Sequence, residues 1–239
     1  MVTLGAPLGL IAYWLTRNDV AAVATAGVSP ELLLSATWHS LGYGLAAGIV
    51  TTLAALPISY LSVRYRHRAV RLMESASFLP RGMPGIVLAL ALVTVSLTLL
   101  RPLYQSAILL IAGYAIMFIP LALVSLRATL AQVQPGLEQS ARALGHRPIA
   151  VLRRVILPLA APGIGAAMAL VFISVTTELT TTLLLIPTGA HTLATQVWAS
   201  SSTFAFAAAA PYAAILVGVS MLATWILANR FGRAPIDME

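Results

Sequence analysis

The chain has 239 residues, of which 59% are hydrophobic and 9% are charged, and its mean hydropathy is +0.92. Because soluble domains carry roughly 25% charged residues, this composition excludes a soluble globular domain and predicts an all-α, polytopic membrane protein. A net charge of +7 can indicate nucleic-acid binding, but the basic residues cluster in short segments between apolar stretches, so we expect no nucleic-acid partner. The absence of cysteine excludes disulfides and thiolate metal sites.

Apolar stretches long enough, or nearly long enough, to cross a bilayer recur along the whole chain. In chain order, the six predicted spans are Met1–Thr16, Leu41–Val63, Gly85–Leu100, Leu103–Leu126, Val155–Leu185 and Ala207–Ala228. Asn18–Ser35 and Ile186–Ser202 are predicted to be loops. No linker or repeat divides the chain, so we expect one transmembrane domain over residues 1–239, built as a bundle of about six helices.

The first stretch has a competing interpretation as a signal peptide, because Ala24–Ala26 resembles a cleavage site. No positive charge precedes the apolar run, and Arg17 and Asp19 interrupt the approach to that site. We therefore expect Met1–Thr16 to be a short or truncated first transmembrane helix.

The distribution of arginine predicts the orientation of the chain, because cytoplasmic loops are enriched in basic residues. If six spans alternate sides, the two arginines on one side are Arg17 and Arg101. The twelve on the other side are Arg64, Arg66, Arg68, Arg71, Arg81, Arg127, Arg142, Arg147, Arg153, Arg154, Arg230 and Arg233. The larger group predicts that both termini, and the polar segment between the fourth and fifth spans, are cytoplasmic.

That polar segment, at about residues 127–156, contains the pattern of a short amphipathic helix. Leu137, Ala141 and Leu144 recur at positions that share one helical face. Glu138 precedes Arg142 by four residues on another face, in the favourable order for an ion pair.

A turn and a second short helix are predicted to follow. Gly145 can leave the first helix in a left-handed conformation, and Pro148 suits the first turn of the next helix. The apolar stripe of that second helix consists of Ile149, Leu152 and Ile156. Such an element is expected either to lie in the membrane interface or to dock into a groove of a partner.

The spacing across this segment resembles the EAA loop, the cytoplasmic coupling loop of ABC importer permeases. That pattern runs Glu-Ala-Ala, three residues, Gly, nine residues, an aliphatic residue, one residue and Leu-Pro. The residues that stand at its positions are, in order, Gln139, Ser140, Ala141, Gly145, Val155, Leu157 and Pro158. Gln139 replaces Glu and Ser140 replaces Ala, although Glu138 stands next to them, so the departures concern the first helix and leave the turn intact.

Other stretches resemble the C-terminal half of ABC importer permeases of the ferric-iron type. They are Leu79-Pro80, Pro84–Val87, Glu178–Leu185, Thr192–Thr195 and Ala209–Tyr212. The resemblance implies a type I importer core in a bacterial inner membrane, a periplasmic substrate-binding protein at its outer face and two cytoplasmic ATPase subunits. Permeases of this type usually carry two homologous halves, so a truncated product, a fragment and a half-size permease that pairs as a homodimer all stay open.

The resemblance assigns contact with the ATPase subunits to ten residues. They are Glu138, Gln139, Ser140, Ala141, Arg142, Gly145, Pro148, Val155, Leu157 and Pro158. No Walker A loop, GxSxG motif or paired-carboxylate arrangement occurs, and the four histidines have no metal-ligand spacing. We therefore expect no enzymatic activity, metal or cofactor on this chain, with ATP and Mg used by a partner subunit.

Glu178 is the only acidic residue inside a predicted span, where a charge costs a few kcal/mol and usually faces the bundle interior or a water-filled path. One interpretation is a residue that lines or gates the translocation path, with Thr181 and Thr182 as further candidates. The other is a polar contact that packs helices or lies near the outer interface.

Three alternative functions stay open. The first is a permease of the same superfamily for thiamine, aminoethylphosphonate or polyamine. The second is a fragment of a gradient-driven secondary transporter or channel that works through Glu178. The third is a structural membrane subunit, against which the regular EAA-like spacing argues. The substrate itself does not follow from the sequence, because fold-level similarity is not a binding site.

Overall fold

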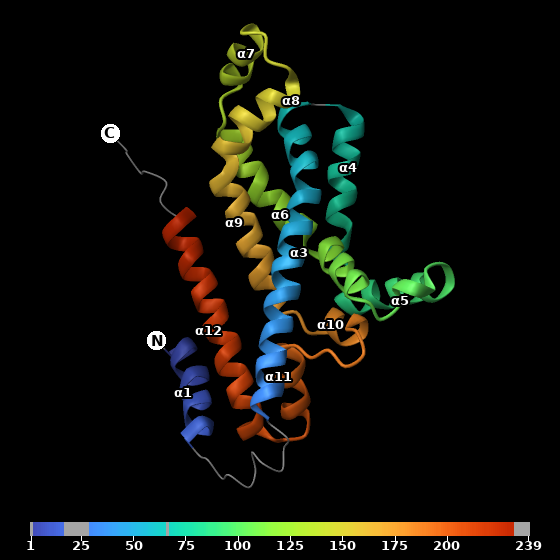
Figure 1. The fold of residues 1–239 in the computed structure, drawn as a ribbon, viewed down its shortest axis with the longest axis vertical. Helices are drawn as coiled ribbons and strands as arrows, with labels where there is room; N and C mark the ends of the chain where they lie inside the picture. Colours follow the sequence, from blue (N-terminus) through green and yellow to red (C-terminus); the bar gives the residue numbers. More distant parts are fainter. Residues whose placement is uncertain (1, 17–28, 66, 232–239) are drawn as a thin grey trace.

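A computed structural model describes residues 2–16, 29–65 and 67–231 (Figure 1). Its helices, in chain order, are α1 (Val2–Thr16), α3 (Pro30–Arg64), α4 (Arg68–Phe78), η1 (Leu79–Gly82), α5 (Gly85–Leu99), η2 (Arg101–Leu103), α6 (Ala107–Gln132), α7 (Pro135–Ala143), α8 (Pro148–Val151), η3 (Leu152–Ile156), α9 (Leu157–Thr176), α10 (Thr180–Leu185), α11 (Leu193–Ser202) and α12 (Phe206–Phe231). No β-strand occurs in these ranges, which confirms the all-α fold class.

Three long helices, α3, α6 and α9, pack against one another in the middle of the bundle (Figure 1). In a bilayer, close packing of this kind depends on small residues that let backbones approach. A Cβ atom added to Gly44 would lie 2.8 Å from Phe172 Cδ2, and one added to Gly48 would lie 3.2 Å from the carbonyl oxygen of Met168. Gly44 and Gly48 thus allow the close approach of α3 to α9.

The start of α3 follows from its sequence. The Ser29 hydroxyl accepts a hydrogen bond from the Leu32 amide at 3.1 Å, and Pro30 occupies the first turn, where no backbone donor is needed. The predicted loop Asn18–Ser35 therefore ends earlier than expected. The predicted span Leu41–Val63 lies entirely within this helix.

Four helices in the described ranges are long and apolar enough to cross a membrane. They are Pro30–Arg64, Ala107–Gln132, Pro148–Thr176 and Phe206–Arg230. A bent pair formed by Arg68–Gly82 and Gly85–Leu99 gives a fifth candidate. α1, which has 15 residues and packs against α12, is shorter than a full crossing. The described residues thus hold four or five candidate spans, where the sequence predicted about six.

The third predicted span, Gly85–Leu100, is not a straight crossing. α5 is bent by 108° from the preceding helix and lies across the long axis of the bundle in Figure 1. Pro80 and Pro84 account for the bend, because proline cannot donate a backbone hydrogen bond. Met83, which precedes Pro84, is extended, as residues before proline prefer.

Two predictions in the C-terminal part of the chain were wrong. The predicted span Val155–Leu185 is broken, because α9 ends at Thr176 and α10 begins only at Thr180. The predicted loop Ile186–Ser202 contains α11, whose first turn is closed by a capping box. The last predicted span, Ala207–Ala228, lies within α12.

Some predictions fall outside the described ranges. They concern the cleavage-site resemblance at Ala24–Ala26, most of the loop before α3, and the arginines Arg17, Arg66 and Arg233.

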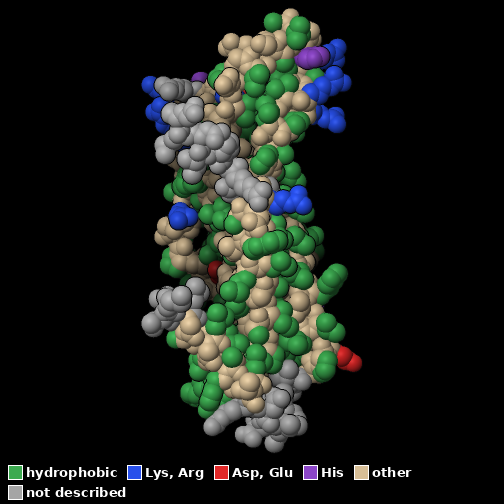
Figure 2. All heavy atoms as spheres, turned by 90° about the vertical axis from the view of Figure 1, so that its left-hand side faces the viewer, with side chains coloured by type: hydrophobic (Ala, Val, Ile, Leu, Met, Phe, Trp, Pro, Cys, Tyr) green, Lys and Arg blue, Asp and Glu red, His purple; other side chains and the backbone are tan. Residues whose placement is uncertain are grey.

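Basic side chains gather at one end of the molecule. Figure 2 shows most of the visible arginine side chains near the end that carries α7 and α8 in Figure 1. α3 ends there and α9 begins there, so this end is where the polar segment joins the long helices.

Candidate functional site

The turn between α7 and α8, formed by residues 141–148, is an elbow closed by backbone hydrogen bonds. Gly145 has φ +83°, a left-handed conformation that side chains disfavour. The His146 amide donates to the Ala141 carbonyl at 3.2 Å and the Gly145 amide to the Arg142 carbonyl at 2.9 Å, which is the Schellman pattern. Pro148 lies in the first turn of α8. The predicted turn geometry is confirmed.

The elbow continues without a break into a membrane-crossing helix. α8, the π-helical turn η3 and α9 form one candidate span from Pro148 to Thr176. Val151 and Ile156 on this rod are buried together with Ala141 of α7 and Leu130 of α6. α7 is therefore joined to α9 through both the chain and a packed apolar contact.

The predicted apolar face of α7 is divided in the structure. Ala141 is buried, whereas Leu137 and Leu144 are 46% and 79% exposed. Ile149 of α8 is also 72% exposed. Large apolar side chains exposed at the polar end of a membrane protein are typical of a surface that meets a partner.

The ten predicted coupling residues lie in different environments. Those exposed on α7, the elbow or the start of α9 are Gln139, Ser140, Arg142, Gly145, Pro148 and Pro158. Val155 and Leu157 are half-buried, and Glu138 and Ala141 are buried. The structure thus brings the first group to the surface and turns Glu138 toward the bundle.

Glu138 has a partner that sequence reasoning missed. Its Oε1 lies 2.6 Å from Nε of Arg64, at the end of α3, whereas Nη2 of the predicted partner Arg142 is 4.0 Å from Oε2. A hydrogen bond with Tyr65 is the main cause that raises the pKa of Arg142. The local Glu138–Arg142 spacing was visible in the sequence, but the contact with Arg64, 74 residues away, has no local signal.

A second polar cluster lies at the break between α9 and α10. Glu178 Oε1 accepts a hydrogen bond from the Thr181 amide at 3.0 Å and so satisfies a donor at the start of α10. The Thr182 hydroxyl donates to the Glu178 carbonyl at 2.5 Å and accepts from the buried Tyr114 hydroxyl at 2.6 Å. A Cβ atom added to Gly85 would lie 3.6 Å from Glu178 Oε1, so the carboxylate lies beside the start of α5.

The three predicted path residues are therefore together, but differently exposed. Glu178 is half-buried, while the Thr181 and Thr182 side chains are fully buried between α5, α6 and α10. Across the described residues, no group of three or more acidic or histidine side chains is placed to hold a metal ion.

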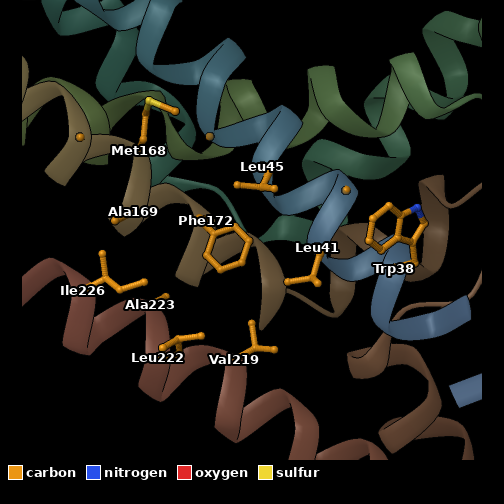
Figure 3. Close-up of a pocket in the computed structure, with 13 residues that line it drawn as sticks. Trp38, Leu41, Leu45, Met168, Ala169, Phe172, Val219, Leu222, Ala223 and Ile226 are labelled. Carbon is orange, nitrogen blue, oxygen red and sulfur yellow. The ribbon is translucent and has the colours of Figure 1, made fainter. Parts of the chain in front are cut away.

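An apolar groove of about 620 Å³ runs between α3, α9 and α12 (Figure 3). The close-up shows Phe172 in its middle, Trp38 at one end, and Leu222 on the facing side of α12. None of its lining residues is charged. Such a surface suits hydrocarbon and offers nothing to replace the hydration shell of an ion.

The apolar helices and the exposed elbow define the class, a multi-pass membrane protein with an exposed helical elbow at its basic end. The model of the family "binding-protein-dependent transport system inner membrane component" matches residues 44–233. The chain belongs to this family of transport-system inner membrane components.

Relatives named for several substrates resemble the chain. It is 34% identical over 227 residues to the Fe(3+)-transport system permease protein FbpB 2 of Haemophilus influenzae, covering 95% of this chain and 44% of that protein. It is 28% identical to a probable molybdenum ABC transporter permease of Haloferax volcanii, covering 96% and 85%. The chain thus spans less than half the length of FbpB 2.

Solved structures of importers share the fold. A chain of the methionine transporter MetNI, in an inward-facing conformation, aligns with TM-score 0.68 and 18% identity over 84% of this chain and 97% of that one. A chain of a bacterial alginate importer aligns with TM-score 0.69 and 14% identity over 97% and 90%.

Proposed function

We propose that the chain carries ferric iron across a bacterial inner membrane, driven by ATPase subunits that grip α7 and the elbow. The proposal depends mainly on the structure of the elbow. This elbow presents Leu137 and Leu144 to a partner, and Gly145 and the Pro148–Thr176 rod join it rigidly to a membrane-crossing helix. A push on α7 then becomes a rigid-body movement of α9.

The proposed orientation places the α7 end in the cytoplasm, where ATP is. The gathering of arginine at that end supports it, through the positive-inside rule. A periplasmic binding protein delivers the substrate at the opposite end. A second permease half or a second copy of this chain completes the path.

The proposed path passes the α9–α10 break. A half-buried carboxylate beside the start of α5 is a favourable contact for a cation inside a membrane protein, and its position at a helix break allows it to move with α10. Ferric iron is supported by the likeness to FbpB 2 across nearly all of this chain. The chain itself needs no bond-breaking chemistry, only different contacts in its two states.

The test is transport by a purified complex. The chain is co-expressed with a candidate ATPase and a candidate binding protein from the same genome and reconstituted in liposomes, and ATP-dependent uptake of ferric iron is measured. We expect uptake that requires both partners and that excess molybdate does not inhibit. Co-purification without ferric-iron uptake, or uptake of molybdate in its place, contradicts the proposed substrate. Failure of any ATPase to co-purify contradicts the proposed coupling.

A further inference from the structure

One guanidinium group fastens the first turn of α7 to the end of α3. Arg64 Nε donates to Glu138 at 2.6 Å, and Arg64 Nη2 donates to the carbonyl oxygen of Val133 at 2.9 Å. The Tyr60 hydroxyl, one turn earlier on α3, donates to the other carboxylate oxygen at 3.4 Å. The Arg64 and Glu138 side chains are 12% and 9% exposed, so water competes little for these bonds.

The geometry uses what arginine alone offers. Its rigid fork holds two acceptors at once, and here Val133 and Glu138 lie on either side of the residue where α7 begins, Pro135. The contact between Glu138 and Arg142 is longer, at 4.0 Å, and the Arg142 side chain is 47% exposed. Exposed pairs of that kind contribute little. Arg64 is thus the main polar attachment of α7 to the bundle.

The chain joins α7 to α6 at its N-terminal end and, through the elbow, to α9 at its C-terminal end. Ala141 adds a buried apolar contact, and Arg64 adds the polar attachment to α3. Without Arg64, a force on α7 reaches α3 only through apolar packing and through α6. With Arg64 in place, the same force acts on α3 directly and displaces α3 and α9 together.

We propose that Arg64 is a positioning residue of the transport cycle, which transmits movement of α7 to α3 through its bonds to Glu138 and Val133. The inference rests on the proposed coupling function. Because Arg64 is buried and the exposed face of α7 lies elsewhere, loss of this attachment leaves the ATPase-binding surface in place. The expected defect is ATP hydrolysis that no longer drives transport.

The cysteine-free chain allows a direct test. The double variant Arg64→Cys/Glu138→Cys removes both charges at once, which avoids leaving one of them buried without a partner. It is reconstituted with the ATPase and the binding protein, and ferric-iron uptake and ATP hydrolysis are measured before and after treatment with a short bifunctional maleimide. We expect transport per ATP to fall about tenfold, within the usual range of coupling between sites, and to recover on linking.

Two results overturn the inference: parental transport per ATP in the unlinked variant, or no recovery after linking. Failure of the parental chain to bind the ATPase or to transport contradicts the proposed function instead. If the double variant does not assemble, the single variant Arg64→Lys is used to test the inference. It keeps Glu138 paired but loses the fork, so transport per ATP should fall with the ATPase still bound, and unchanged transport overturns the inference.

A matched control uses the other long-range ion pair in the described ranges, between Glu74 of α4 and Arg127 of α6. The variant Glu74→Cys/Arg127→Cys also removes a pair of charges near the same end but leaves α7 attached. Linking these two residues should not change transport per ATP. If linking Cys residues at these two positions raises transport per ATP as much as linking them at Arg64 and Glu138 does, cross-linking has a general effect and the inference is overturned.

Discussion

The elbow and the α9–α10 break lie at opposite ends of the Pro148–Thr176 rod, and they are built differently. At the elbow, Gly145 takes a positive φ and backbone amides bond to backbone carbonyls. At the break, side chains replace backbone partners: the Thr177 hydroxyl bonds back to the Ile173 carbonyl at 3.0 Å, and Glu178 accepts from the Thr181 amide.

This contrast separates a joint closed by its own backbone from one that depends on neighbouring helices. The hydrogen bonds of the elbow join residues close in sequence around one glycine, so its shape does not depend on distant helices. The break depends on Tyr114 of α6 and lies beside the start of α5, so a shift of either helix alters it. We interpret the elbow as the lever and the break as the part that moves.

The largest effect is expected at the elbow. Gly145→Pro imposes φ near −65° where the structure has +83°, and it removes the amide that bonds to Arg142. We expect the protein to insert and to reach normal amounts in the membrane, while ferric-iron uptake is abolished. Immunoblotting of membranes and uptake by cells measure the two quantities.

The matched control is Gly145→Asn, because asparagine adopts the left-handed conformation more readily than other side chains. It should retain most of the uptake. Parental uptake in Gly145→Pro would falsify the role of the elbow as a lever.

The next effect concerns the carboxylate at the break. Glu178→Gln keeps an oxygen that can accept from Thr181 but removes the charge, whereas Glu178→Ala removes both. We expect both to lower ferric-iron transport about tenfold, the equivalent of a contact of about 1.4 kcal/mol. The Ala variant alone should also lose about 1 kcal/mol of stability, the usual value of a helix cap. Full transport in the Gln variant would mean that Glu178 only caps α10.

A smaller effect, on stability, is expected where α3 packs against α9, the helix between the elbow and the α9–α10 break. Gly44 of α3 lies against Phe172 of α9, while a Cβ atom added to Gly42 meets nothing within 4 Å. Gly44→Val should therefore reduce the free energy of unfolding in micelles by about 2 kcal/mol through overpacking. Gly42→Val is the control and should change it far less. Equal losses in the two variants would show that the α3–α9 contact is looser than described.

The smallest effect is expected from one buried hydroxyl. Tyr114→Phe removes the bond to Thr182 and should cost about 1 kcal/mol of stability. Tyr212→Phe is the control, because the Tyr212 hydroxyl is buried with no hydrogen-bond partner among the described residues. Removing that hydroxyl should be neutral or slightly stabilising. Thermal unfolding of the two variants side by side measures the difference, and a larger loss in Tyr212→Phe contradicts the assignment.

Local chemistry explains what the sequence could predict. Gly145 and Pro148 predict the elbow, because their backbone preferences act within a few residues. The apolar runs predict α3, α6 and α12. The spacing around Gln139 and Pro158 was enough to indicate the family, which the match over residues 44–233 then showed.

Long-range contacts explain what it could not. Glu138 was paired with Arg142 from its spacing, but its nearer partner is Arg64 in a distant helix. The Val155–Leu185 run is mostly apolar despite Glu178 and the threonines beside it, so its mean hydropathy does not show that α9 ends at Thr176. The angle of 108° before α5 could not be predicted, because the apolar length of a segment says nothing about its direction.

The most direct test of the whole account is the side of the membrane on which the elbow lies. Leu144 is 79% exposed, and the chain has no cysteine, so Leu144→Cys offers a single thiol for labelling. A thiol reagent that cannot cross membranes should label it in inside-out vesicles and not in intact cells, and bound ATPase should protect it. Labelling in intact cells would place the elbow outside, away from ATP, and contradict the account.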